Sequence, residues 1–67
     1  MKLNEWRLSK QLSYRDLAKK VGANHATIAR RWCLSEEHPQ RLIPNPDYMK
    51  AIMLATDGAV NANDFYN

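Results

Sequence analysis

Apolar residues recur at helical spacing along most of this 67-residue chain, with the clearest pattern in residues 12–32. Within residues 14–21, Leu17, Ala18 and Val21 fall on one face of a helix, and charged side chains take four of the other five positions. Apolar positions at i, i+1 and i+4 are typical of an amphipathic helix that buries one side. The pattern therefore predicts a helix over residues 14–21.

Capping residues bound this helix and start a second one shortly after it. Ser13, with Asp16 three residues later, forms a capping box. Gly22 stands where a left-handed residue ends a helix. Asn24 is then expected to cap a second helix, over residues 24–32. Because so short a link turns one helix sharply across the other, the pattern predicts a helix-turn-helix.

Further helices are expected on both sides of this pair. Residues 2–10 carry Leu3 and Trp6 one turn apart, and both are expected in the core. Asn45 followed by a proline and an acidic residue is a strong helix start, which predicts a helix over residues 46–56. Asn61 is expected to cap a single turn near the end of the chain.

A polar connector, residues 35–41, lies between the predicted helices over residues 24–32 and 46–56. Pro39 prevents a long helix there. The connector carries two glutamates, so we expect it to point away from any polyanion that the basic part of the chain faces. Leu42 and Ile43 follow it and are expected to return to the core.

Charge is distributed unequally along the chain. Residues 1–32 hold eight Lys and Arg against two Asp and Glu, a net charge of +6, whereas residues 33–67 hold two against five, a net charge of −3. A basic half is typical of a surface that faces a polyanion. Alternatively, the basic half is a solvated, lysine-rich surface. Because the predicted helix pair lies within the basic half, the first interpretation is favoured.

Length and composition limit the remaining classes of function. A chain of this length predicts one domain, residues 1–67, with a small core. Cys33 is the only cysteine, which suits a reducing cytoplasm, and no apolar run is long enough for a membrane span. Neither His25 nor His38 has an acidic or cysteine partner at ligand spacing. We therefore expect no metal, no cofactor, no small-molecule substrate and no enzyme activity.

The spacing of Ala18, Gly22 and Ile28 resembles that of the phage repressor and Cro-type (XRE-like) helix-turn-helix family. Residues 43–66 resemble the last helix and tail of many small members. Arg31 is a departure, because the family usually has an apolar residue or Trp at that position.

The resemblance implies an all-α, four- to five-helix lambda-repressor/Cro-like DNA-binding domain with its helix-turn-helix at about residues 14–32. It also implies a sequence-specific double-stranded DNA-binding regulator of transcription, a Cro-like autoregulatory repressor of phage or prophage type. Such a protein binds a palindromic operator as a homodimer, with residues 24–32 in the major groove, in the cytoplasm at the bacterial nucleoid. The expected dimer interface is residues 46–56 with the tail, residues 60–66.

The second helix of the pair supplies the candidate base-reading residues. With Ile28 pointing inward, Ala26 and Arg30 point directly outward. Ala29 and Thr27 flank them. Arg30 is the candidate for a bidentate contact to guanine. The full set expected to face bases is Asn24, His25, Ala26, Thr27, Ala29 and Arg30.

Phosphate contacts are expected from the first helix of the pair and from the end of the second. The candidates are Tyr14, Arg15, Lys19, Lys20 and Arg31. Two interpretations of Tyr14 remain open: its hydroxyl donates to a phosphate oxygen, or its ring packs on the preceding helix.

A protein–protein interaction module is the alternative function. Small helix-turn-helix proteins also serve as antitoxins or as anti-CRISPR-associated adaptors. In that case the acidic C-terminal half would bind a protein partner. An exposed apolar surface in that half, or an adjacent toxin gene, would distinguish the two.

Overall fold

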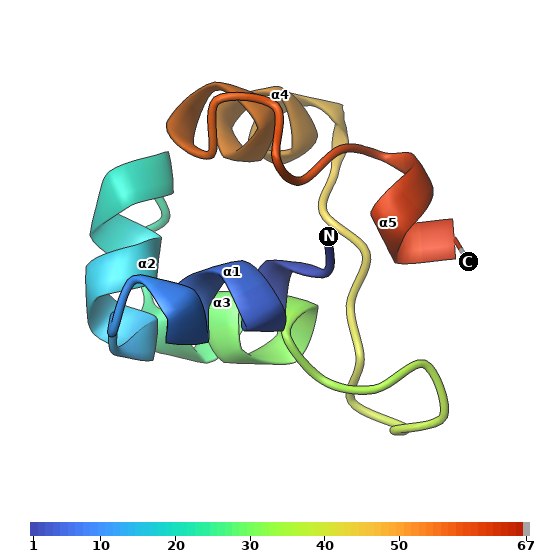
Figure 1. Ribbon diagram of the computed structural model, residues 1–67. Coiled ribbons are helices and arrows are strands. Elements are labelled where there is room, and N and C mark those ends of the chain that lie inside the picture. The colour runs from blue at the N-terminus through green and yellow to red at the C-terminus, as the bar shows by residue number, and fades with distance from the viewer. Residues whose placement is uncertain (67) are drawn as a thin grey trace.

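The computed structural model describes residues 1–66, which form five helices and no strand. The helices are α1 (Leu3–Ser9), α2 (Tyr14–Val21), α3 (Ala26–Trp32), α4 (Pro46–Ala55) and α5 (Asn63–Tyr66). The second helix packs against both α3 and α4, and α4 lies across the top of the molecule in Figure 1. The expected all-α class is confirmed.

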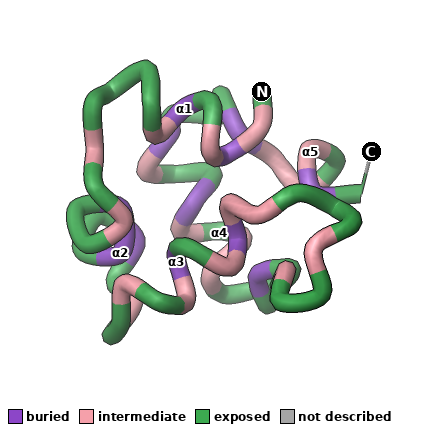
Figure 2. The backbone as a smooth tube through the Cα atoms, turned by 90° about the horizontal axis from the view of Figure 1, so that it is seen from below, coloured by how far each residue is buried: buried purple, intermediate pink, exposed green. Residues whose placement is uncertain are grey.

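One apolar cluster joins the helices. Leu17, Ile52 and Val60 are its largest fully buried side chains, and Leu3 and Trp6 are buried as expected. Figure 2 shows buried positions on all five helices. The complete cluster consists of Leu3, Trp6, Leu17, Ala18, Val21, Ala29, Trp32, Ile52, Val60 and Phe65. The core therefore draws on every helix and on the tail that follows α4.

The caps of α2 are those that the sequence predicts. The Asp16 amide donates to the Ser13 hydroxyl oxygen at 3.0 Å, and the Ser13 amide donates to the Asp16 carboxylate at 3.2 Å. Gly22 ends the helix with a φ of 76°, a conformation that costs glycine little. These local bonds satisfy backbone groups that a helix leaves without intrahelical partners.

The capping box makes the free energy of unfolding depend on pH in the acid range. Hydrogen bonds from Ser13 hold the pKa of the Asp16 carboxyl below its usual value of 3.8. The interaction therefore contributes fully above about pH 4 and is lost as the pH falls through the folded-state pKa. Asp16→Asn is expected to flatten the acid limb of the free energy of unfolding, measured by urea titrations between pH 5 and pH 2. An acid limb as steep as that of the unmodified protein would contradict this. Glu37→Gln, which removes a carboxylate without a hydrogen bond in the described residues, is the control.

The start of α3 differs from the prediction. The helix begins at Ala26, with His25 in the N-cap position and no side-chain cap bond, so the expected cap at Asn24 is wrong. The reason is that the turn is longer. The Ala23 amide donates to the Ala18 carbonyl at 2.8 Å as part of the α2 ending, and His25 is extended. Asn24 and His25 therefore both lie in the turn, before the first residue of α3.

The fourth helix begins and ends close to its predicted limits. The Tyr48 amide donates to the Asn45 side chain at 2.9 Å, which confirms the cap. Thr56 is buried just beyond the helix: its hydroxyl donates to the Ile52 carbonyl at 2.8 Å and accepts from the Val60 amide at 3.1 Å. This hydroxyl fixes the tail against the end of α4.

Leu42 and Ile43 do not return to the core. They are 37% and 36% exposed, and Pro44 is the buried residue of this segment. The Leu42 amide donates to the Arg31 carbonyl at 3.1 Å, which holds the backbone at the end of α3. The chain consequently runs along the surface before it turns inward at the proline.

The tail folds back as a short helix. The Asn63 amide donates to the Asn61 side chain at 3.0 Å, so Asn61 caps this turn as expected, and the helix itself begins at Asn63. The Asn61 amide donates to the Asp64 carboxylate at 2.9 Å. Phe65 is thereby buried in the core.

Candidate nucleic-acid interface

Basic side chains of α2 meet the start of α3 at a shared surface. Arg15 and Lys19 lie one turn apart on α2, and both are exposed. They line one hollow together with Asn24 and His25 of the turn and with Ala26, the first residue of α3. The structure thus brings together five predicted DNA-contacting residues that are up to eleven positions apart in the sequence.

The rotation of α3 about its axis differs from the prediction. Ala29 is fully buried and Trp32 is 2% exposed, whereas Ile28, which was expected to define the inward face, is only half-buried. Since the small Ala29 packs in the core, the expectation that it faces outward and contacts bases is wrong. The physical reason is that the side chain with the least bulk lets α3 approach α2 closely, so the inward direction lies between Ala29 and Trp32.

The remaining outward positions of α3 are Thr27 and Arg30, which are both exposed. Asn24 and His25 are exposed in the preceding turn, and Ala26 is half-buried. A helix surface with one long guanidinium among small polar side chains is suited to enter a groove and form one directional contact. This surface adjoins the hollow described above.

Tyr14 is held by the first helix. The Arg7 guanidinium carbon lies 4.2 Å above the centre of the Tyr14 ring, and the ring is half-buried. Arg7 also donates to the Leu12 carbonyl at 2.8 Å. The packing interpretation of Tyr14 therefore has a specific contact, a cation–π pair, and its contact to phosphate stays a prediction.

Lys20 and Arg31 complete the predicted phosphate set. Lys20 is exposed near the end of α2. Arg31 is half-buried, and its Nε donates to the Gln40 carbonyl at 2.8 Å. Arg31 is therefore engaged with the connector, whereas Lys20 faces solvent.

Gln40 is the residue that sequence reasoning missed. Its side-chain oxygen accepts from Arg30 Nη1 at 3.3 Å, and its carbonyl accepts from Arg31. Gln40 therefore brings the second half of the connector beside the basic side chains of α3, and the expectation that the connector points away from a polyanion stays a prediction. Helical periodicity carries no signal for such a contact, because it joins residues ten positions apart through an irregular segment.

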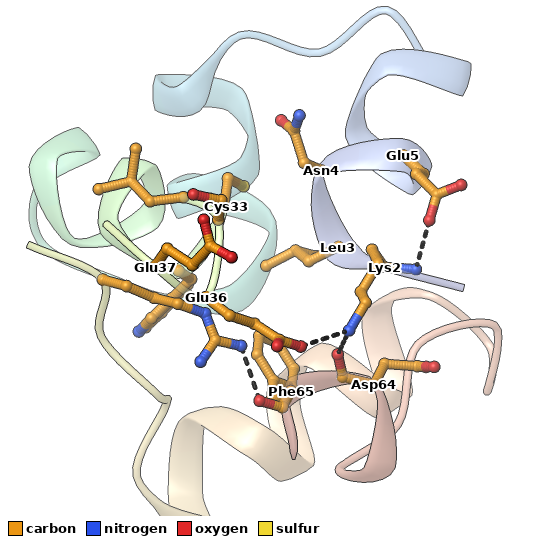
Figure 3. A pocket seen from close by; sticks show the side chains of 13 residues that line it. Lys2, Leu3, Asn4, Glu5, Cys33, Glu36, Glu37, Asp64 and Phe65 are labelled. Atoms are coloured by element: carbon orange, nitrogen blue, oxygen red, sulfur yellow. Dashed lines mark hydrogen bonds and ion pairs between the residues drawn. The ribbon is translucent and has the colours of Figure 1, made fainter. Parts of the chain in front are cut away.

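A cavity of about 570 Å³ lies on another part of the surface, between the start of α1, the connector and α5 (Figure 3). Lys2 Nζ donates to the Glu36 carboxylate at 3.3 Å and to the Asp64 carbonyl at 2.7 Å. Arg41 donates to the Phe65 carbonyl at 2.7 Å. These bonds tie the start of the connector to the N-terminal end of the chain and its last residue to α5.

Cys33 lies at the wall of this cavity, directly after α3. Burial raises the pKa of the Cys33 thiol to about 11, and the neighbouring Arg7 guanidinium only partly offsets this. The thiol is therefore protonated at neutral pH, a state in which cysteine is a poor nucleophile. Within residues 1–66, no cluster of His, Cys, Asp and Glu side chains is placed to hold a metal ion.

No protein-family model, curated protein or solved structure matches this chain. None of the helices described here has the length and apolar character needed to cross a membrane.

Proposed function

We propose that this protein is a sequence-specific double-stranded DNA-binding regulator of transcription, with α2 and α3 as a Cro-like helix-turn-helix. The observation that carries the proposal is the surface shared by the two helices. It combines the exposed cations Arg15 and Lys19, the turn residue His25, and the outward face of α3 with Thr27 and Arg30. Phosphate contacts fix the register of such a protein on DNA, and side chains on the inserted helix read the bases.

In the proposed complex α3 enters the major groove, and α2 lies across the sugar–phosphate backbone. Arg15 and Lys19 face a phosphate at the hollow, while Arg30 donates to guanine O6 and N7. The acidic half of the chain stays outside the groove, since its net charge of −3 is repelled by DNA. Bound at a promoter, such a domain acts by excluding RNA polymerase, which makes repression in the cytoplasm the proposed outcome.

Salt dependence tests the phosphate contacts. Lys19→Ala is expected to reduce the slope of log binding constant against log salt concentration by about 0.9, because one fewer counterion is released. Lys10→Ala removes the same charge from an exposed position directly after α1, outside both the surface proposed to face DNA and α4, and is expected to leave the slope unchanged. Equal slopes for the two variants would mean that α2 does not face the phosphates. The measurement is fluorescence anisotropy on one labelled duplex from 50 to 300 mM salt.

We further propose that the protein binds a palindromic operator as a homodimer through α4. Leu54 on this helix is 74% exposed and Met53 is 41% exposed, an apolar surface in the otherwise acidic half of the chain. Of the tail, Val60 and Phe65 are buried in the core, so they are not available to a partner. The proposed contact surface is therefore narrower than the sequence suggested.

Leu54→Lys tests this dimer. The variant is expected to sediment as a monomer at concentrations where the unmodified protein is a dimer, and to bind operator DNA more weakly. Analytical ultracentrifugation with and without DNA gives the result. If the unmodified protein is monomeric both free and on DNA, the proposed homodimer is wrong. That result would favour the alternative, an adaptor whose acidic half binds another protein.

A further inference from the structure

The second half of the connector is fixed to the outward side of α3 by its backbone. The Gln40 carbonyl accepts from Arg31 Nε at 2.8 Å, and the Leu42 amide donates to the Arg31 carbonyl at 3.1 Å. The Gln40 amide in turn donates to His38 Nδ1 at 3.0 Å. In Figure 1 the connector leaves the end of α3 and loops back towards it before rising to α4. These three bonds hold Gln40 in place without using its side chain.

The Gln40 side chain is therefore free to act on Arg30. Its Oε1 accepts from Arg30 Nη1 at 3.3 Å, and both residues are exposed. In the described part of the chain the Arg30 guanidinium makes no other hydrogen bond. A long, exposed arginine otherwise samples many rotamers, so this single bond selects among them.

The bond leaves the donors that base reading needs. A guanidinium has five N–H groups, and Gln40 engages only Nη1. The edge formed by Nε and Nη2 remains available for two parallel bonds to guanine O6 and N7. A side chain that is already oriented loses less conformational entropy when it binds.

We propose that Gln40 is a positioning residue that orients the Arg30 guanidinium and thereby sets sequence specificity from the connector. This inference rests on the proposed function, since it assigns Gln40 a role in base reading by Arg30. It places part of the specificity outside the two helices. Because one exposed hydrogen bond contributes modestly, the expected effect is about three- to tenfold in affinity for specific DNA.

The experiment compares Gln40→Ala with the unmodified protein on two duplexes: one selected by the protein from a randomised pool, and a scrambled one of equal length. Gln40→Ala is expected to weaken binding to the selected duplex about three- to tenfold and to leave binding to the scrambled duplex unchanged. The backbone bonds of Gln40 persist in the variant, so its thermal unfolding is expected to be unchanged. Ser35→Ala, at an exposed connector position without a side-chain hydrogen bond in the described residues, is the matched control.

A double-mutant cycle distinguishes positioning from direct contact. If Gln40 acts through Arg30, Gln40→Ala has no further effect in an Arg30→Ala background. An equal loss in both backgrounds would overturn the inference, because Gln40 would then contact DNA on its own. If Arg30→Ala lowers specific binding and Gln40→Ala does not, the inference fails and the proposed function stands. If Arg30→Ala itself leaves the ratio of the affinities for the two duplexes unchanged, Arg30 does not read bases. The inference about Gln40 then fails as well.

Discussion

Trp32→Ala is expected to destabilise the protein by about 3–5 kcal/mol, the cost of emptying a large buried aromatic site. Trp32 is 2% exposed at the end of α3, and its ring centre lies 5.1 Å from that of Tyr48 on α4. A core from a chain of this length rarely supplies more than about 3–5 kcal/mol. The substitution is therefore expected to leave much of the protein unfolded at 25 °C.

Urea unfolding followed by circular dichroism at 222 nm measures this effect. Leu8→Ala is the control, because Leu8 is 59% exposed on α1 and its loss is expected to change the free energy of unfolding by less than about 0.5 kcal/mol. A Trp32→Ala protein that unfolds at nearly the same urea concentration as the unmodified protein would contradict the burial of Trp32 and its ring contact with Tyr48.

Arg30→Ala is expected to weaken binding to specific DNA by about ten- to a hundredfold, because a bidentate contact to guanine contributes roughly 1–3 kcal/mol of discrimination. Binding to a scrambled duplex is expected to fall only by the small amount that loss of one positive charge explains. The side chain is exposed on the outward face of α3, so its removal leaves the core intact.

Arg30→Lys separates charge from geometry in this prediction. Lysine keeps the positive charge and lacks the planar fork of donors, so the loss on specific DNA is expected to persist while binding to the scrambled duplex recovers. Anisotropy titrations of both variants on both duplexes at one salt concentration give the comparison. Equal losses on the two duplexes would show that Arg30 contacts phosphate only.

The sequence was most informative where a structure is decided within a few residues. The bonds between Ser13 and Asp16, the cap at Asn45 and the left-handed Gly22 all follow from local chemistry that neighbouring positions complete. The burial of Trp6 followed from apolar spacing on one helix face. These features allowed the elements, the all-α class and most of the core to be predicted.

Features that depend on how elements pack were not accessible from the pattern. The rotation of α3 places the small Ala29 fully in the core, and the larger, half-buried Ile28 was a misleading guide to the inward side. Asn24 has the right chemistry for a cap, but the ending of α2 uses the residue before it and shifts the start of α3. The Gln40–Arg30 contact depends on the path of an irregular connector, which no local propensity specifies.

Sequence-specific recognition of DNA is tested most directly by fluorescence anisotropy on the DNA upstream of the protein's own gene, across a salt series, with a scrambled duplex as control. We expect tight binding to the upstream DNA, weak binding to the scrambled duplex, and affinities that fall steeply with salt on both. Equally weak binding to the two duplexes would contradict sequence-specific recognition. It would mean that the basic side chains of α2 and α3 form only a solvated surface.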